Sequence, residues 1–292
     1  MRNTLESLLS IVVPISNPDE RHKELGEWIN ECLDNGIQVI LVHDTNSFES
    51  NPFIESLVNR INDSNFSQIS GNFGSPGAAR NAGRLLARNK WMSFWDSDDT
   101  PKVSEFCKMV KLANAKNVDA CIGGYAEFSI NTNKIVKCHY PEKTLDIAID
   151  PGLWRIAFRK NLIGSINFTS NLMGEDQIFM IDFFKTQRNC LFFNSIVYKY
   201  NTGHPRQLTN ANGNYIELEK FCKHLGNNFV PRNDFYSLVY LKALMSLLIR
   251  SKRKMRINLI GEIFILLLVK RTIKASSVLK ILFRIIPNRH TK

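Results

Sequence analysis

Apolar runs of strand length alternate with helical patterns along the first hundred residues of the chain. The run 37–42 is apolar almost throughout, which is typical of a strand that helices cover on both faces. Residues 10–15 form a second, β-branched run. Between the two, apolar residues recur at helical spacing from 25 to 33 and stop at an Asn-Gly pair, which predicts a helix.

The alternation continues up to residue 95. We expect a helix around 54–61, a short strand near 68–70, a helix through Leu85 and Leu86, and a strand at 91–95. Strands that alternate with helices in this way predict an α/β fold with a mostly parallel sheet and helices on both faces. Residues 118–193 mix shorter strands and helices and continue the same domain.

The character of the chain changes near residue 221, where long helical patterns with interleaved Lys and Arg begin. Residues 232–292 carry 14 Lys and Arg against two acids, a charge of +12, whereas the whole chain carries +11. The remainder is therefore close to neutral, with 24 Lys and Arg against 25 Asp and Glu. We predict an α/β domain at 1–220 and a basic amphipathic helical extension at 221–292, whose charge favours an anionic partner.

Composition narrows the class of protein. With 44% hydrophobic and 10% aromatic residues, the chain is globular rather than disordered. Its six cysteines show no CxxC pair and no zinc spacing, which favours a reduced, cytoplasmic chain. The N-terminal run predicts a strand rather than a signal peptide, and no uncharged apolar run is long enough to predict a transmembrane helix.

Three carboxylates follow the apolar strand at 91–95, namely Asp96, Asp98 and Asp99. Packed together they repel one another, so at least one stays protonated unless a cation lies nearby. They fall at the carboxyl end of a strand, where open α/β sheets bind ligands, and Asp44 falls at the same edge. One or two carboxylates with substrate phosphates are the usual ligands of Mg²⁺ or Mn²⁺. A solvated turn is the alternative, and an EF-hand is excluded by the spacing.

A second acidic pair, Glu175-Asp176, precedes an apolar helical run. Taken alone, it is typical of the N-terminus of a helix, where the macrodipole favours negative charge. It is also a candidate for proton transfer, because a carboxylate can accept the proton of an attacking hydroxyl group.

Five segments in this order resemble those of the family 2 glycosyltransferases: SIVVPISN, ILVHDTNS, NFGSPGAARNAG, MSFWDSDDTP and GEDQIF. The resemblance covers about residues 8–210. Within the family, the chain resembles bacterial O-antigen and capsule sugar transferases. It implies a GT-A fold, with a Rossmann-like, mostly parallel sheet flanked by helices. It also implies an enzyme that uses nucleotide-diphosphate sugars, usually UDP-sugars.

The resemblance implies a nucleotide site. Pro14 matches the end of the first strand beside the nucleotide, and Asp44 matches the acid that recognises the uracil ring. Arg80 and Asn81 match the element that flanks the nucleotide. His43 stands where the family often has a second acid, a departure that bears on the preference for uracil.

The resemblance also implies the reacting groups. Asp96 would contact the ribose, and Asp98 or Asp99 would bind a divalent cation, Mn²⁺ or Mg²⁺, that neutralises the leaving diphosphate. The main metal ligand stays open between these two. Asp176, with Glu175 beside it, matches the general base for an in-line, inverting displacement.

For three further residues, a functional role is implied only by the resemblance to the family. His204 and Arg206 lie in a loop that matches one closing over the diphosphate, and Trp154 matches a tryptophan on the acceptor side. Ordinary loop residues and core packing are the alternatives.

The basic extension favours an anionic membrane surface, because its apolar stripes alternate with cationic residues. Nucleic acid is disfavoured, since stacking aromatics are few there. We expect a cytoplasmic protein, peripheral on the inner face of the plasma membrane, with a lipid-linked oligosaccharide or other glycan as acceptor. Helices that simply pack on the body are the alternative.

The function expected is an inverting, metal-dependent glycosyltransferase of cell-surface polysaccharide synthesis. A sugar nucleotidyltransferase would need a Gly-rich, basic loop after the first strand, which residues 14–23 lack. A membrane-bound scaffold with the same fold and no activity is the alternative from another class, and a nucleic-acid-binding tail on an unrelated domain is a third. Metal-dependent binding of UDP separates the enzyme from the scaffold.

Overall fold

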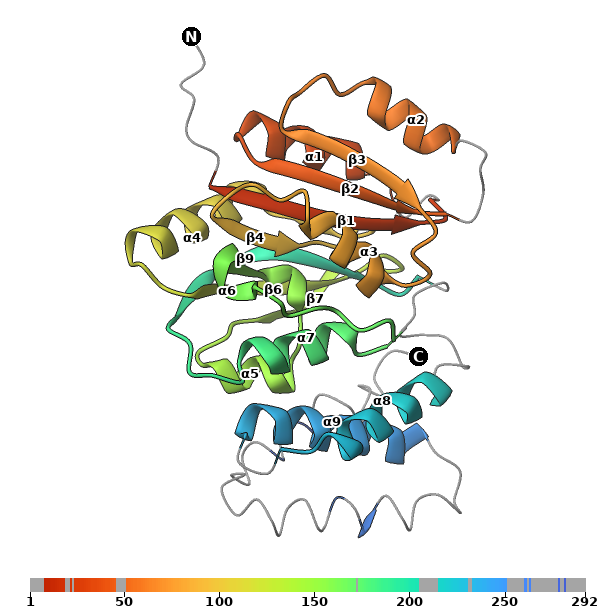
Figure 1. The fold of residues 1–292 in the computed structure, drawn as a ribbon, viewed down its shortest axis with the longest axis vertical. Coiled ribbons are helices and arrows are strands. Elements are labelled where there is room, and N and C mark those ends of the chain that lie inside the picture. Colours follow the sequence, from red (N-terminus) through yellow and green to blue (C-terminus); the bar gives the residue numbers. More distant parts are fainter. Residues whose placement is uncertain are drawn as a thin grey trace.

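A single mixed sheet, flanked by helices on both faces, forms the centre of the described structure (Figure 1). The computed structural model describes residues 8–18, 22, 24–45, 51–171, 173–204, 215–230, 233–250, 260–261, 263, 278 and 281. Within these residues the sheet has nine strands, in the order β3-β2-β1-β4-β8-β6-β9-β5, with β7 paired to β6.

The first four strands of this order are parallel. They are β1 (Leu9–Ser16), β2 (Gln38–Asp44), β3 (Phe66–Gly71) and β4 (Trp91–Phe94). Val12 of β1 lies opposite Ile40 on one side and Phe94 on the other, so the carboxyl ends of β1, β2 and β4 meet at one edge. The parallel pairing predicted for this half is confirmed.

The second half of the sheet is mixed. It contains β5 (Thr100–Pro101), β6 (Ala120–Ser129), β7 (Lys134–His139), β8 (Ile156–Arg159) and β9 (Cys190–Thr202). Because β8 runs antiparallel to both of its neighbours, β4 and β6, it is a single reversed strand at the centre of the sheet, and β6 and β9 again run parallel to β4. The described sheet is therefore mostly parallel, as predicted, with β5, β7 and β8 as its antiparallel strands.

The helices divide between the two faces. One face carries α1 (Leu25–Asp34), α2 (Pro52–Asn59) and α4 (Val103–Ala115), whose buried side chains join one apolar cluster. The other carries α3 (Pro76–Arg84), α5 (Thr144–Ile149), α6 (Lys160–Ile163), α7 (Glu175–Phe183), α8 (Tyr215–Asn227) and α9 (Asp234–Arg250). The face that α1 buries is the one that its helical pattern predicts.

Two predicted boundaries differ from the structure. We expected a helix through Leu85 and Leu86, but α3 ends at Arg84 and Leu85 is 79% exposed. The amides of both leucines bond three residues back, so the chain tightens into a turn that leads to β4. The boundary placed after residue 220 falls inside α8, whose side chains share an apolar cluster with the sheet.

Within the described ranges, no helix has the length and apolar character needed to cross a bilayer. Most of the predicted extension beyond residue 250 lies outside the described residues.

Candidate active site

Asp44, at the end of β2, lies at the edge where the parallel strands end. Its Oδ1 accepts hydrogen bonds from the backbone amides of Phe73 at 2.7 Å and Gly74 at 3.1 Å. Gly74 has a φ of 70°, a conformation that glycine adopts without strain. Asp44 therefore holds the loop before α3 against the strand, while its side chain stays partly exposed. Asp44 lies opposite Ser16 of the neighbouring β1, two residues after Pro14.

Arg80 is the centre of the site. It is 6% exposed, on a helix that Ser75 caps through a hydrogen bond from Ala78. Its Nη2 lies 2.8 Å from Asp96 Oδ1, and its Nη1 lies 2.8 Å from Glu175 Oε1. One guanidinium therefore joins the acidic turn after β4 to the acidic start of α7.

The next residue, Asn81, is engaged with the backbone. Its amide donates to Phe168 O at 2.8 Å and accepts from Phe168 N at 3.0 Å. The Phe168 ring in turn lies under the Arg80 guanidinium, 5.5 Å from ring centroid to Cζ. Arg80 and Asn81, which the resemblance places beside the nucleotide, thus also shape the wall that holds both acidic pairs.

Strand β9 holds the acidic turn in place. The Asp96 amide donates to the Tyr198 hydroxyl at 3.1 Å, and the Asn201 amide donates to Asp99 Oδ1 at 2.8 Å. The Asn201 side chain donates to Asp98 O at 2.8 Å. Asp99 is 3% exposed, whereas Asp98 stays partly exposed. The turn therefore directs Asp99 inward and leaves the Asp98 side chain at the surface of the edge.

The carboxylates of the site outnumber its cationic side chains. Burial raises the pKa of Asp96, although Arg80 opposes this, and burial followed by the charges of Asp98 and Asp96 raises the pKa of Asp99. Asp99 Oδ2 is buried and has no hydrogen-bond partner among the described groups. Asp98 and Asp99 therefore fit a divalent cation that substrate phosphates would also ligate. The described side chains contain no group of three or more metal-ligating residues.

Glu175 is held by Arg80 and has little contact with solvent. It is 8% exposed in the first turn of α7, which follows Gly174 in a left-handed conformation. Burial and the nearby charge of Asp176 raise the pKa of Glu175 to about 7, while Arg80 acts in the opposite direction. Because its carboxylate is used in a buried ion pair, Glu175 is poorly placed to meet an incoming hydroxyl group.

Asp176 is the more accessible of the two acids. It is partly exposed, and its Oδ1 accepts the amide of Gln177 at 2.8 Å. Burial raises the pKa of Asp176, and the charges of Arg80 and Lys242 lower it. Its position in the first turn of a helix also favours the ionised form.

Trp154 lies in the 3-10 turn η2 (Leu153–Arg155) and is 8% exposed. Its ring stacks on Tyr198 at 4.4 Å and on Tyr200 at 5.5 Å, and it meets Tyr125 edge-on at 4.8 Å. Trp154 thus packs in the core beside the residue that holds the Asp96 amide.

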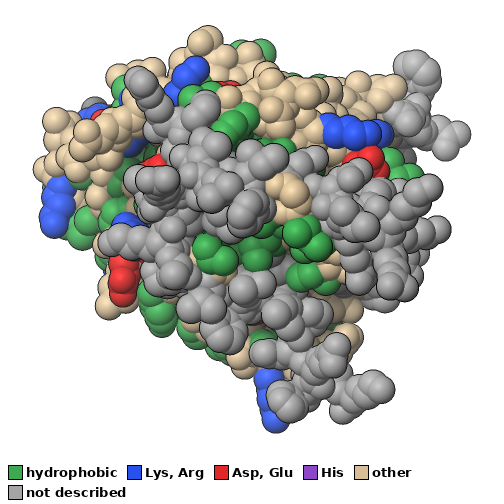
Figure 2. Space-filling view, turned by 90° about the horizontal axis from the view of Figure 1, so that it is seen from below, with side chains coloured by type: hydrophobic (Ala, Val, Ile, Leu, Met, Phe, Trp, Pro, Cys, Tyr) green, Lys and Arg blue, Asp and Glu red, His purple; other side chains and the backbone are tan. Residues whose placement is uncertain are grey.

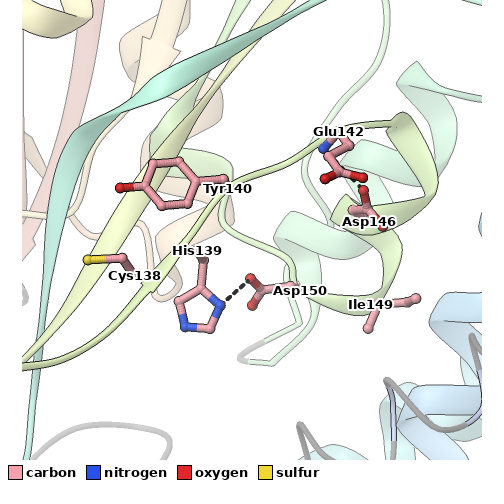
Figure 3. A pocket seen from close by; sticks show the side chains of 7 residues that line it. All are labelled: Cys138, His139, Tyr140, Glu142, Asp146, Ile149 and Asp150. Carbon is pink, nitrogen blue, oxygen red and sulfur yellow. Dashed lines mark hydrogen bonds and ion pairs between the residues drawn. The ribbon is translucent and has the colours of Figure 1, made fainter.

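A cavity of about 270 Å³ adjoins this aromatic stack (Figure 3). Its lining includes His139 at the end of β7, Asp146 on α5, and Asp150. Figure 3 shows His139 and Asp150 pointing toward each other, with His139 Nδ1 3.3 Å from Asp150 Oδ2. Tyr125 joins the cavity to Trp154, because its ring stacks on His139 at 4.5 Å.

Of the two predicted loop residues, His204 lies within the described residues and Arg206 does not. His204 follows β9 and is partly exposed. Arg206 lies outside the described residues, so its predicted role stays a prediction.

Tyr198, Asn201 and Phe168 are site residues that sequence reasoning did not identify. Tyr198 and Tyr200 alternate along β9, a pattern that places them on one face of a strand. That signal predicts a shared face, but it does not predict which turn the face contacts.

Comparisons with known proteins give the family and the fold of the chain. A sequence model of the family described as Glycosyl transferase family 2 matches residues 10–200. The chain is also similar to the Glycosyltransferase GlyG of Streptococcus pneumoniae serotype 4 (strain ATCC BAA-334 / TIGR4). The two are 22% identical over 218 residues, which are 67% of this chain and 71% of the relative.

Solved structures share the fold. S. aureus TarS 1-349 in complex with UDP-GlcNAc has a TM-score of 0.66 at 15% identity, over 95% of this chain and 89% of that chain. Mannosyltransferase PcManGT from Pyrobaculum calidifontis, in complex with GDP-Man and Mn²⁺, has a TM-score of 0.58 at 12% identity, over 98% and 89%. At these identities the likeness shows the fold alone, and it confirms the GT-A architecture.

Arg80→Met should lower the free energy of unfolding by about 3–5 kcal/mol, because the buried Glu175 carboxylate and the partly exposed Asp96 carboxylate lose their partner. Arg88→Met is the control on the exposed turn after α3, and it should change that free energy by less than about 0.5 kcal/mol. Urea denaturation at pH 7 measures both. Equal losses in the two variants would contradict a central role for the Arg80 ion pairs.

Proposed function

The chain belongs to glycosyl transferase family 2, and we propose that it is an inverting, metal-dependent enzyme that moves a sugar from a UDP-sugar to a hydroxyl group of a glycan. That it is a glycosyltransferase follows from the family. The observation that carries the rest is the Arg80 bridge, because it brings the acids after β4 and the acids of α7 to one guanidinium.

The donor lies along the edge where β1, β2 and β4 end. Asp44 and Pro14 flank the base, and Asp96 faces the ribose. Support comes from the common edge of these strands and from two proteins of the same fold that were solved in complex with UDP-GlcNAc and with GDP-Man. His204 and Arg206 complete the diphosphate side.

Asp98 would hold the divalent cation, with Asp99 behind it. Asp98 is the partly exposed member of the pair, whereas the Asn201 amide engages one oxygen of buried Asp99. When bound, the cation neutralises the charge that develops on the leaving diphosphate. The excess of carboxylates over cationic side chains around Arg80 supports this choice.

Asp176 removes the proton from the acceptor hydroxyl group. As the acceptor oxygen bonds to the anomeric carbon, the bond from that carbon to the diphosphate breaks and UDP leaves with the electron pair. Attack opposite the leaving group inverts the anomeric carbon. Glu175 does not exchange this proton. It is a positioning residue that ties α7 to Arg80.

The acceptor is a lipid-linked glycan, and Trp154 lies on its side of the site. Support for a membrane partner comes from the charge of +12 on residues 232–292 and from exposed apolar side chains at the end of the molecule that α8 and α9 form. Ile216 is 52% exposed and Ile249 is 43% exposed. Figure 2 shows this end of the molecule, with hydrophobic side chains visible on it. Such a surface suits the inner, anionic face of a membrane.

Binding of UDP with Mn²⁺ should raise the free energy of unfolding by about 2.7 kcal/mol at a hundredfold excess over the dissociation constant. Asp98→Ala should abolish this rise, because the cation loses its accessible ligand. Asp34→Ala, an exposed acid at the end of α1, is the control and should keep it. Thermal unfolding with UDP, GDP or CDP, with and without Mn²⁺, tests the proposal. A shift that needs no metal, or that survives in Asp98→Ala, would contradict it.

Asp176→Asn should lower kcat by about 10²–10⁴-fold without changing the stabilisation by UDP and Mn²⁺, since only proton transfer is lost. Asp182→Asn, an exposed acid further along α7, should leave kcat unchanged. Release of UDP from UDP-GlcNAc, UDP-glucose and UDP-galactose measures kcat. Proton NMR of the product gives its anomeric configuration, and retention would rule out the single displacement.

Replacing Lys252, Arg253, Lys254 and Arg256 by Gln should weaken sedimentation with vesicles that contain phosphatidylglycerol. Each basic side chain near an anionic surface contributes about 1 kcal/mol, and salt screens it. The control replaces Lys108 and Lys111 of α4, and Lys116 directly after it, by Gln. Equal binding to phosphatidylcholine vesicles, or no binding by the wild type, would contradict a membrane partner.

A further inference from the structure

The C-terminal helices contact the turn that starts the helix of the proposed base. Gly174 precedes Glu175 and has a φ of 82°, and a Cβ there would lie 2.6 Å from the ring of Phe221 on α8. Phe221 itself is 2% exposed. The ring therefore rests directly on the backbone of the turn, and glycine is required there both for its φ and for this close approach.

Helix α9 supports the same element. The Tyr236 hydroxyl donates to Leu225 O at 2.7 Å and so ties α9 to α8. Phe235 of α9 lies 5.1 Å from Phe184, the residue after α7. In Figure 1, α7 lies between the sheet and this pair of helices. Movement of α8 or α9 would therefore displace the start of α7.

The two helices also bring a charge to Asp176. Lys242 is a partly buried residue of α9, and its positive charge favours the ionised form of the Asp176 carboxyl. Arg80 from α3 acts in the same sense, whereas Glu175 and Asp96 bring negative charge to the same group. Lys242 is thus the cation that the C-terminal helices contribute to the surroundings of Asp176.

We propose that α8 and α9 form a positioning element for Asp176, in which Phe221 seats the turn at Gly174 and α9 holds α8 against α7. This inference rests on the proposed function, which makes Asp176 the base. A base must lie within hydrogen-bond reach of the proton that it removes, and a displacement of 1 Å can reduce the rate a hundredfold. Residues 215–230 and 233–250 are then part of the catalytic domain as well as a candidate membrane surface.

The first experiment compares Phe221→Leu with Leu225→Ala. Both remove apolar atoms from buried positions of α8, but only Phe221 touches Gly174. Phe221→Leu should lower kcat by about tenfold to a hundredfold with the KM for the donor unchanged. Leu225→Ala should keep kcat within about threefold of wild type, at a temperature where circular dichroism shows both variants folded. Equal losses of kcat would overturn the proposal.

Asp176→Asn separates the two proposals. The assay is release of nucleoside diphosphate from UDP-GlcNAc, UDP-glucose, UDP-galactose or GDP-mannose with Mn²⁺. If Asp176→Asn is inactive while Phe221→Leu and Leu225→Ala behave alike, only the positioning element is wrong. If Asp176→Asn keeps full activity, or the wild type releases nothing from any donor, the proposed function fails and this inference fails with it.

Discussion

The site depends on one buried guanidinium. Arg80 makes an ion pair with Asp96 and another with Glu175, each at 2.8 Å, and these partners lie 16 and 95 positions from it in sequence. A buried charge is tolerated only when it is paired and hydrogen-bonded, so the guanidinium and the Glu175 carboxylate stabilise each other. Displacement of Arg80 would leave the buried Glu175 carboxylate without its cation. The relative positions of β4 and α7 are therefore set by the same contact that organises the proposed chemistry.

Aromatic packing supports this contact from the apolar side. Phe179 of α7 stacks on Phe168 at 4.2 Å and meets Phe94 of β4 edge-on at 5.6 Å. Phe168 also lies under Arg80, at 5.5 Å. Such ring pairs favour particular geometries, so they restrict how α7 can slide on the sheet. The helix that carries Asp176 is thus held by Arg80 at its start, by rings on its inner face and by Phe221 of α8 from outside.

Charge imbalance connects this architecture to function. Arg80 pairs with Asp96 and Glu175, and the charges of Arg80 and Lys242 lower the pKa of Asp176. Burial nevertheless raises the pKa of Asp96, Asp99, Glu175 and Asp176. Acids with raised pKa values at a strand edge are typical of functional sites, because a structure selected for stability alone would avoid them. A metal ion and the catalytic proton would both relieve this imbalance. The same excess of carboxylates therefore accounts for the Arg80 ion pairs and for the metal ion of the proposed sugar transfer.

The sequence by itself determined the first strands and helix, and the sheet edge at which the acids lie. Hydrophobic period alone predicted β1, β2 and the buried face of α1, and the apolar strand before Asp96 predicted that the acids lie at a carboxyl end. Only the tertiary structure decided that Glu175 pairs with Arg80, that the Asn201 amide holds Asp99 while Asp98 stays accessible, and that α8 belongs with the sheet. The reason is that periodicity reports which face a residue occupies over a few turns, whereas these contacts join residues about a hundred positions apart. They depend on strand register and on side-chain packing between elements, which local pattern does not encode.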